Sequence, residues 1–470
     1  MVVSTPLAFE PSSFRDPSSG VVLDGDRVLR YAVGEAGPAL AGVLAAPWFS
    51  ALIAEEKVER TTPLAREDAP GLYRALPGIT AAFEHPRLPF ISYPYEWSFE
   101  MLRAAALLQL ELVEASFANG HMVKDATSYN VQFRGARPTF IDFGSFEPYA
   151  AGEGWRAYGQ FCRLFLNPLY LQAYGGVPFQ PWLRSAIDGL DTEVVRRLLP
   201  LRAKLRPSVF VDVVLQSMLT RRFAANEQAL RSARERAIPD TAVRGMVSRA
   251  RKTVEKLPRR KRRSAWSGYE DDRAHYSPAA VAFRERFVAE VVDRARPSML
   301  WDLGCNTGRF SLLAAKTAQH VVAIDGDEAS IDLLFERARE AAPNVHPLVM
   351  DLLNPSPNQG WAQAERQGLA ERGPADVVLA LALVHHIAIS GNVPLPRFAA
   401  WLASVGRSAI VEFVPKADPM VQRLLLTRKD VYGGYTIEAF ESALAEHWII
   451  AERAAVPDTS RVLYHLERHG

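Results

Sequence analysis

The chain has 470 residues, which is too long for one hydrophobic core and predicts two or three domains. Basic residues (55) nearly balance acidic ones (53) and 48% of residues are apolar, which excludes a disordered or strongly basic chain. Two cysteines exclude a disulfide framework and a cysteine-rich metal site. Because no basic-then-apolar leader and no long apolar run is readable, we expect a cytoplasmic protein with no membrane span.

The first half has the element order of an α+β domain, strands first and helices afterwards. Residues 20–34 alternate around "DGD", which predicts a β-hairpin, and helical periodicity follows across 36–57. The runs "GLYRAL" and "PFISYPY" are typical of short strands. Residues 98–118 form an amphipathic pattern opened by a serine cap, which predicts a long helix before a polar loop. Mostly helix is expected from 155 to 236.

A basic stretch follows this half. Ten Lys and Arg residues lie between Arg244 and Arg263, against the single acid Glu255. We therefore expect a basic linker over 241–265, between a first domain of residues 1–240 and a second of 266–470. The linker could contact nucleic acid, anionic lipid or a phosphorylated substrate, or it could be a solvated connection or helix face. It lacks the interleaved aromatic residues of a single-strand stacking platform.

The last 190 residues alternate apolar strands with amphipathic helices, which predicts an α/β domain with a parallel sheet covered on both faces. The predicted strands are "SMLWDLG", "HVVAID", "VHPLVMD", "ADVVLALAL" and "SAIVEFV". Helices are predicted at "RFSLLAAKTA" and "EASIDLLFERARE". The tail, "HWIIAERAAV" and "RVLYHLER", is expected to add two adjacent strands at the sheet edge.

The turn after the first of these strands reads "DLGCNTG", with Asp302, Gly304, Asn306 and Gly308. A dinucleotide fingerprint counted from Gly304 would need glycines where Asn306 and Arg309 stand, so that interpretation fails. The pattern D-x-G-x-N-x-G resembles motif I of class I S-adenosylmethionine-dependent methyltransferases. The resemblance implies a Rossmann-like fold and S-adenosylmethionine as the cofactor.

Further residues agree with this family in order. Asp325 ends the second strand, where a carboxylate can accept the ribose hydroxyls of a nucleoside, and Asp351 ends the third, where the family places an acid near adenine. His385 and His386 in "LALVHHI" match the family's histidine-containing segment after the fourth strand. Either histidine could be a general base, or the pair could only shape the pocket. Glu412, at the end of the fifth strand, is a second base candidate expected to face the same crevice.

The loop at 121–146 carries another pattern. Asp125 and Asn130 have the spacing of D-x-x-x-x-N, and Asp142 begins "DFG" after a short hairpin. This resembles the catalytic loop of protein kinases and aminoglycoside phosphotransferases. The resemblance implies a kinase-like fold for the first half, with Asp125 orienting a hydroxyl and Asn130 and Asp142 holding Mg²⁺ beside ATP. The match departs from the family because no glycine-rich loop is evident and Arg30 stands where a lysine is expected.

Together the two halves are similar to bacterial kinase-like/methyltransferase fusion proteins, including rhizobial nodulation-type proteins. This resemblance implies O-methylation of a small-molecule or glycan acceptor that the kinase-like half phosphorylates or positions. The alternative is an RNA or protein methyltransferase steered by the basic linker, with a degenerate kinase fold as scaffold. A catalytically dead scaffold is a third option, but the presence of Asp302, Asp325 and Asp351 at the strand ends argues against it.

Overall fold

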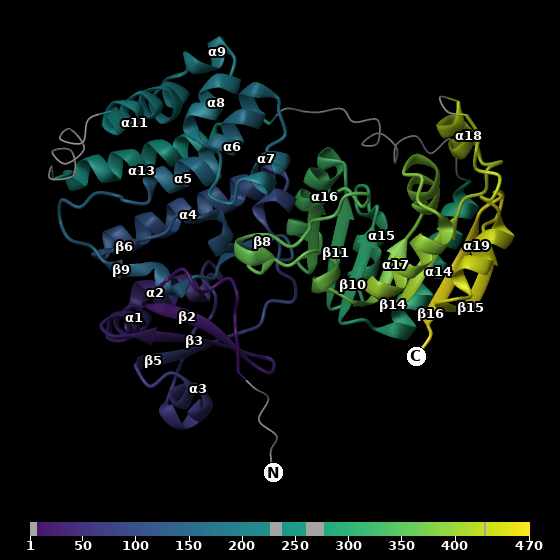
Figure 1. The fold of residues 1–470 in the computed structure, drawn as a ribbon, viewed down its shortest axis with the longest axis horizontal. Helices are drawn as coiled ribbons and strands as arrows, with labels where there is room; N and C mark the ends of the chain where they lie inside the picture. Colours follow the sequence, from purple (N-terminus) through teal and green to yellow (C-terminus); the bar gives the residue numbers. More distant parts are fainter. Residues whose placement is uncertain (1–6, 226–236, 260–276, 427–428) are drawn as a thin grey trace.

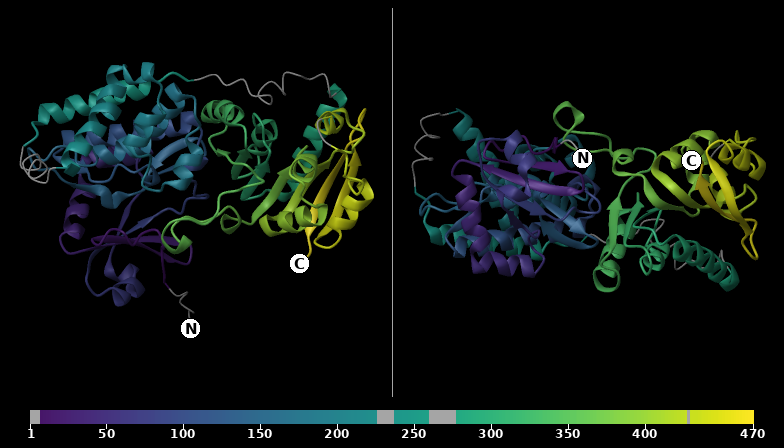
Figure 2. Two further views of the ribbon diagram at one scale, coloured as in Figure 1. Left: turned by 45° about the horizontal axis from the view of Figure 1, so that its top comes forward. Right: turned by 90° about the horizontal axis from the view of Figure 1, so that it is seen from below.

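The computed structural model describes residues 7–225, 237–259, 277–426 and 429–470 (Figure 1). It contains two large sheets, one in each half of the chain, and the halves lie side by side in both further views (Figure 2). The α+β order predicted for the first half and the α/β alternation predicted for the second are both present. The proposed domain boundaries, 1–240, 241–265 and 266–470, stay a prediction.

The N-terminal sheet has five strands in the order β1-β2-β3-β5-β4, with antiparallel neighbours throughout. The predicted hairpin is β2–β3, and Gly25 turns it at φ 61°, a left-handed conformation that glycine adopts without strain. The strands are β1 (Ala8–Phe9), β2 (Ser19–Asp24), β3 (Arg27–Val33), β4 (Thr62–Leu64) and β5 (Ile79–His85).

Helices α1 (Ala36–Ala45) and α2 (Pro47–Ala54) occupy the stretch with predicted helical periodicity. They meet at a bend of 70°, because Pro47 begins the second helix and cannot continue the hydrogen bonding of the first. In the described part of the chain, no single helix is long and apolar enough to cross a membrane. The bent α1–α2 pair meets that test of length and composition only when its two helices are taken together.

Two predicted strands are wrong. "GLYRAL" lies in helix α3 (Pro70–Ala75), where the proline stands at the first turn that favours it. "PFISYPY" is an irregular segment that ends in a short 3-10 helix, because its two prolines have no amide hydrogen for a strand ladder.

The predicted long helix is α4 (Phe99–Ala118), and the Ser98 hydroxyl caps it by accepting the Met101 amide hydrogen at 3.5 Å. Two small hairpin-like pairs follow and frame the polar loop. They are β6 (His121–Val123) with β9 (Phe146–Pro148), and β7 (Val131–Arg134) with β8 (Arg137–Phe140).

The predicted helical region is confirmed up to residue 225, and residues 226–236 lie outside the described chain. Several of its helices run into one another through π-helical turns, so that residues 158–175 and 207–225 are each one continuous run. The elements are α5 (Tyr158–Phe161), η5 (Cys162–Leu166), α6 (Asn167–Tyr170), η6 (Leu171–Gly175), α7 (Gln180–Ser185), α8 (Thr192–Leu198), α9 (Leu201–Lys204), α10 (Pro207–Val209), η7 (Phe210–Leu215) and α11 (Gln216–Ala225).

The expected basic linker is partly a packed helix. Helix α13 (Asp240–Glu255) buries four small apolar residues at helical spacing and lies against α4 (Figure 1). Three of its arginines are used inside the fold: Arg249 pairs with buried Asp212 at 2.7 Å, Arg251 pairs with Glu114 at 2.6 Å, and Arg244 stacks on Phe117. Residues 241–255 thus lie in a helix packed on α4, which agrees with the helix face among the alternatives for this stretch, while residues 260–265 lie outside the described chain.

The C-terminal sheet has seven strands in the order β12-β11-β10-β13-β14-β16-β15. The first five are parallel, and β16 is antiparallel to both of its neighbours, so that β15 forms the edge. The parallel strands and the two adjacent strands at the sheet edge are as predicted. The strands are β10 (Met299–Leu303), β11 (His320–Asp325), β12 (Val345–Val349), β13 (Ala375–Ala380), β14 (Gly406–Phe413), β15 (Trp448–Ala455) and β16 (Val462–Arg468).

The strands are connected and covered by helices, as a parallel sheet requires on both of its faces. These helices are α14 (Pro278–Ala295), α15 (Arg309–Ala314), α16 (Glu328–Ala341), η11 (His386–Ser390), α17 (Leu395–Val405), α18 (Pro419–Leu425) and α19 (Ile437–Leu444).

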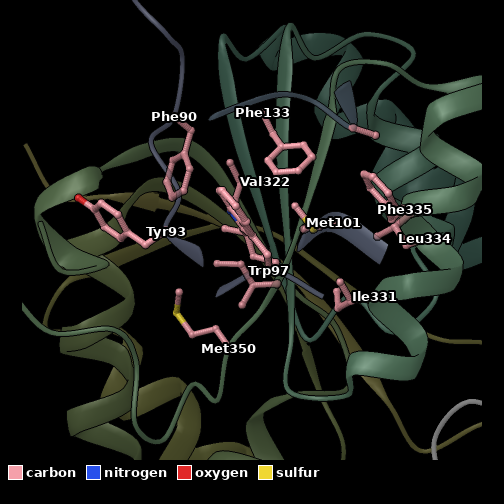
Figure 3. Close-up of a cluster of buried hydrophobic side chains, with 14 of the residues drawn as sticks. Phe90, Tyr93, Trp97, Met101, Phe133, Val322, Ile331, Leu334, Phe335 and Met350 are labelled. Atoms are coloured by element: carbon pink, nitrogen blue, oxygen red, sulfur yellow. The ribbon is translucent and has the colours of Figure 1, made fainter. Parts of the chain in front are cut away.

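The two halves share one hydrophobic core, which the sequence did not predict. Figure 3 shows aromatic side chains of the first half beside apolar side chains of β11, α16 and the end of β12. Phe133 meets Phe335 with ring centroids 6.0 Å apart, and Phe90 meets Trp301 at 5.9 Å, both edge to face. Such close packing of buried side chains is typical of the interior of a single domain, and it holds the two halves together.

Polar contacts reinforce the junction around the start of α4. The Glu328 carboxylate, on α16, accepts hydrogen bonds from the Phe99 amide at 3.1 Å and from Gln172 and Gln180 at 2.7 and 2.8 Å. Asp332, one helical turn later, accepts the Glu100 amide hydrogen at 3.2 Å. Two acids from the second half therefore satisfy amides at the N-terminus of a helix from the first half.

Candidate functional site

A cavity of about 1030 Å³ lies at the carboxyl ends of the parallel strands β10, β11 and β13. This is where open α/β sheets bind ligands. Its wall contains six of the residues singled out in the sequence: Asp302, Gly304, Asn306, Asp325, Asp351 and His386. Four elements far apart in sequence therefore meet at one place. Gly308, His385 and Glu412 are not part of this wall.

The turn between β10 and α15 brings backbone to the cavity. Gly304 and Gly308 have φ values of 77° and 86°, and Asn306 has φ 51°. Asparagine is one of the few non-glycine residues that adopt this conformation readily, which explains why it can stand in the middle of the motif. At Gly308 a Cβ atom would lie 2.2 Å from a methyl group of Leu334, so this glycine permits close helix–helix packing.

Asp302 is buried at the end of β10. Its carboxylate accepts a hydrogen bond from the Ser311 hydroxyl at 2.6 Å, which ties the strand to helix α15. Burial raises the pKa of Asp302 to about 7. The residue touches the cavity, but its main contact is within the protein.

Asp325 ends β11 beside the turn. Its two oxygens accept the amide hydrogens of Asn306 and Asp327, each at 2.8 Å, and burial raises the pKa of the carboxyl group. Two more lone pairs on these oxygens suit a pair of hydroxyl donors. Asp351 is exposed at the end of β12 and also lines the cavity. These carboxylate acceptors fit the hydroxyl and amino donors of a nucleoside.

The adjacent histidines differ in their surroundings. The ring of His386 lines the cavity, whereas His385 is buried behind it, with ring centroids 4.2 Å apart. Burial lowers the pKa of His386, and burial together with His386 lowers the pKa of His385 to about 3. Both imidazoles are therefore neutral near pH 7, and of the two only His386 can meet an acceptor.

The expectation that Glu412 faces the crevice is wrong. Its carboxylate is fully buried and pairs with the Arg284 guanidinium of α14 at 2.7 Å, while Arg461 lies 3.9 Å away. A buried acid held by two cations cannot serve as a base for a ligand in the cavity. Arg284, which the sequence reasoning missed, lines the cavity in its place and lies over the Phe310 ring at 5.0 Å.

A second cavity, of about 1290 Å³, adjoins the first and shares Gly326, Asp327, Met350 and Asp351 with it. Its other wall comes from the first half, including Tyr95 and Arg184. The Arg184 guanidinium donates to the carbonyl oxygens of Asn354 and Pro355 at 3.0 and 2.9 Å. The first half thus holds the loop that follows Asp351. No local sequence signal could reveal this, because it depends on how the halves dock.

The structure also brings the kinase-like residues together. The side-chain amide of Asn130 donates a hydrogen bond to the Asp142 carboxylate at 3.0 Å. The pKa of Asp125 is raised, mainly by burial and then by the negative charge of Asp142. On its other oxygen Asp142 pairs with Arg30, from the middle of β3, at 3.0 Å. A guanidinium cation therefore already neutralises the carboxylate expected to bind Mg²⁺.

Other charges around this loop are paired as well. Lys124 binds Asp16, in the segment between β1 and β2, at 3.0 Å. Lys57 pairs with Glu55 and Glu111. Within the described chain no group of three or more His, Cys, Asp or Glu side chains is arranged to hold a metal ion. Because Asp142 is paired with Arg30, the residues as they stand do not leave this carboxylate free for Mg²⁺.

Comparison with known proteins gives one extended match. The chain is 37% identical over 461 residues to nodulation protein NoeA of Rhizobium meliloti (strain 1021), covering 97% of this chain and 95% of that protein. No family model matches the chain.

Solved structures give lower similarity. The N-methyltransferase NodS from Bradyrhizobium japonicum WM9, in complex with S-adenosyl-L-homocysteine, is 12% identical; it aligns with 44% of this chain and 100% of its own, at a TM-score of 0.31. The bifunctional kinase-methyltransferase WbdD is 19% identical and covers 46% of each chain, at a TM-score of 0.30.

Proposed function

This chain belongs to the family of nodulation protein NoeA, and we propose that it is an S-adenosylmethionine-dependent methyltransferase. One observation carries the proposal: the left-handed turn at 304–308 and the Asp325 carboxylate border one cavity, at the end of a sheet whose last strands have the order β14-β16-β15. Glycine backbone and a paired acid at this edge are what a nucleoside cofactor needs.

The cofactor would supply an electrophilic methyl group in this cavity. Asp325 would bind the ribose hydroxyls, Asp351 would lie toward adenine, and the backbone of Gly304 and Asn306 would contact the amino-acid end. Gly308 acts indirectly, by allowing α15 to pack on Leu334.

We place an oxygen acceptor, on a small molecule or a glycan, on the side of His386. A neutral imidazole with a lowered pKa accepts a hydrogen bond well and holds a proton weakly. His386 would therefore orient the acceptor hydroxyl, and alignment would contribute more than proton abstraction. His385 supports the His386 ring from behind and touches no ligand.

For the first half we propose a kinase-like fold that positions the acceptor. The order β6, polar loop, β7–β8 and β9 supports the fold, with Asn130 and Asp142 side by side. The Arg30–Asp142 pair favours positioning over phosphoryl transfer, because Arg30 already neutralises the carboxylate that would hold Mg²⁺. Steering of RNA by the basic linker gains no support from α13, whose arginines are partly used within the fold.

Calorimetry on the full chain tests the cofactor assignment with S-adenosyl-L-homocysteine as the ligand. Asp325→Asn should weaken binding at least about tenfold, since two hydroxyl donors lose a charged acceptor. Asp293→Asn, an exposed carboxylate on α14, is the matched control and should bind as the parent chain does. If the parent chain shows no affinity for this ligand, the proposal is wrong.

The role of the first half is tested by titrating ATP with Mg²⁺. We expect no binding to the parent chain. Binding that Asp142→Asn abolishes would instead support phosphorylation of the acceptor, with Asn130 and Asp142 as the metal ligands and Asp125 as the residue that orients the hydroxyl.

A further inference from the structure

The helical part of the first half exposes many apolar side chains, none of which lines the first cavity. More than half of the exposed large apolar side chains in the described residues fall between residues 194 and 219. We call this set the helical patch; it consists of Val194, Leu198, Leu201, Leu205, Phe210, Val211, Leu215, Met218 and Leu219.

The elements that carry the patch are neighbours in the fold. Helices α8, α9 and α11 each contact the π-helical turn η7, and Figure 1 shows these helices together at one end of the first half. Leu201 and Leu205 are 73% and 75% exposed, and Met218 is 59% exposed. Exposure of this extent across neighbouring helices is unusual for a surface with no partner.

The segment that carries the patch is rich in positive charge. Seven basic residues and three acidic ones lie between residues 191 and 222. Of the acids, Asp191 caps helix α8, Asp212 is buried and paired with Arg249, and Glu193 is shared by Arg196, Arg197 and Arg221. Of the remaining cations, Arg202, Lys204 and Arg222 are exposed or partly exposed, and Arg206 is exposed and lies over the Tyr174 ring at 4.5 Å.

We propose that the helical patch docks on an anionic lipid surface. Leucine, phenylalanine and methionine side chains would enter the boundary between headgroups and acyl chains, and the arginines and lysine would contact lipid phosphates. A second copy of the chain fits less well, because self-association would bring two positively charged rims together. Nucleic acid fits less well because it offers no apolar surface to match the leucines.

Vesicle co-sedimentation of the full chain tests the assignment. The chain should sediment with vesicles of phosphatidylcholine mixed with phosphatidylglycerol and bind at least about tenfold more weakly to phosphatidylcholine alone. The combined variant Leu201→Ser, Leu205→Ser and Met218→Ser should lose binding to the mixed vesicles by about tenfold or more. Trp361→Ser, which removes a 75% exposed apolar side chain elsewhere, is the matched control and should bind like the parent chain.

A second variant separates charge from apolar contact. Arg202→Gln with Lys204→Gln and Arg222→Gln should reduce the preference for phosphatidylglycerol while circular dichroism stays that of the parent chain. Equal binding to both kinds of vesicle, or none to either, would overturn the proposal. So would a dimer of the parent chain, measured by light scattering, that the serine variant converts to monomer.

Discussion

The Arg372 guanidinium and the Glu96 carboxylate form a two-point ion pair, at 2.6 and 2.9 Å, between the two halves of the chain. Both side chains are almost fully buried, at 2% and 1% exposure, and Arg372 also lies over the rings of Phe90 and Tyr93. Because both charges are removed from water, removing one side chain would leave the other charge buried without a counter-charge.

Removing one partner should therefore destabilise the junction. We expect Glu96→Gln to lower the free energy of unfolding by about 3–5 kcal/mol, because the Arg372 charge stays buried without its counter-charge. The double variant Glu96→Gln, Arg372→Met should recover much of this loss. Chemical denaturation measures both, with the exposed Arg137–Glu56 pair as control: Glu56→Gln should change the free energy by less than about 1 kcal/mol. A loss in the double variant as large as in the single one would contradict this account.

A glycine at the junction gives a second test. Gly135 turns β7 into β8 at φ 58°, and a Cβ atom there would lie 1.6 Å from the carbonyl oxygen of Pro343 in the second half. Gly135→Ala should lower the melting temperature measured by calorimetry and expose apolar surface at the junction. Gly120→Ala is matched, because φ is 72° but nothing lies within 4 Å of the added atom. It should show only the backbone strain, roughly 1–2 kcal/mol. Equal effects would mean that the close approach to Pro343 is unimportant.

The sequence predicted the parallel sheet and most of the cavity because both follow from local patterns. Apolar strands ending in Asp302, Asp325 and Asp351 must carry these acids to one sheet edge, whatever surrounds them. The orientation of Glu412 could not be predicted in this way, since it depends on α14 supplying Arg284 from a distance in sequence. The short runs "GLYRAL" and "PFISYPY" failed because proline chemistry outweighs apolar composition over so few residues.

The shared core was hidden for a related reason. Phe90 and Phe133 look like the interior residues of any domain, and no periodicity indicates that their partners lie on β10 and α16. Only the docked structure shows that one face of the first half is completed by the second.

Because the first half holds the loop after Asp351, it should contribute to cofactor affinity. Arg184→Ala removes hydrogen bonds to the backbone of Asn354 and Pro355 and should weaken S-adenosyl-L-homocysteine binding roughly threefold to tenfold, about 0.6–1.4 kcal/mol. Arg294→Ala, which removes an exposed pair with Glu452, is the control and should leave the affinity unchanged. Titration calorimetry compares the two. An unchanged affinity in Arg184→Ala would show that the second half forms the site by itself.

Asp302 gives the last prediction, because its pKa is raised to about 7 in the folded protein from an ordinary value near 4. The folded state therefore holds this proton more tightly, so the contribution to stability is present in acid and is lost as pH rises through about 7. Asp302→Asn keeps an acceptor for the Ser311 hydroxyl but has no proton to lose, so its melting temperature should fall less than that of the parent chain between about pH 5 and pH 8. Ser311→Ala should keep the titrating group but strengthen the pH dependence, because the Ser311 hydrogen bond lowers the pKa of Asp302 and its loss lets burial raise that pKa further. If the parent chain and Asp302→Asn gave parallel curves across this interval, the buried carboxyl would not titrate there.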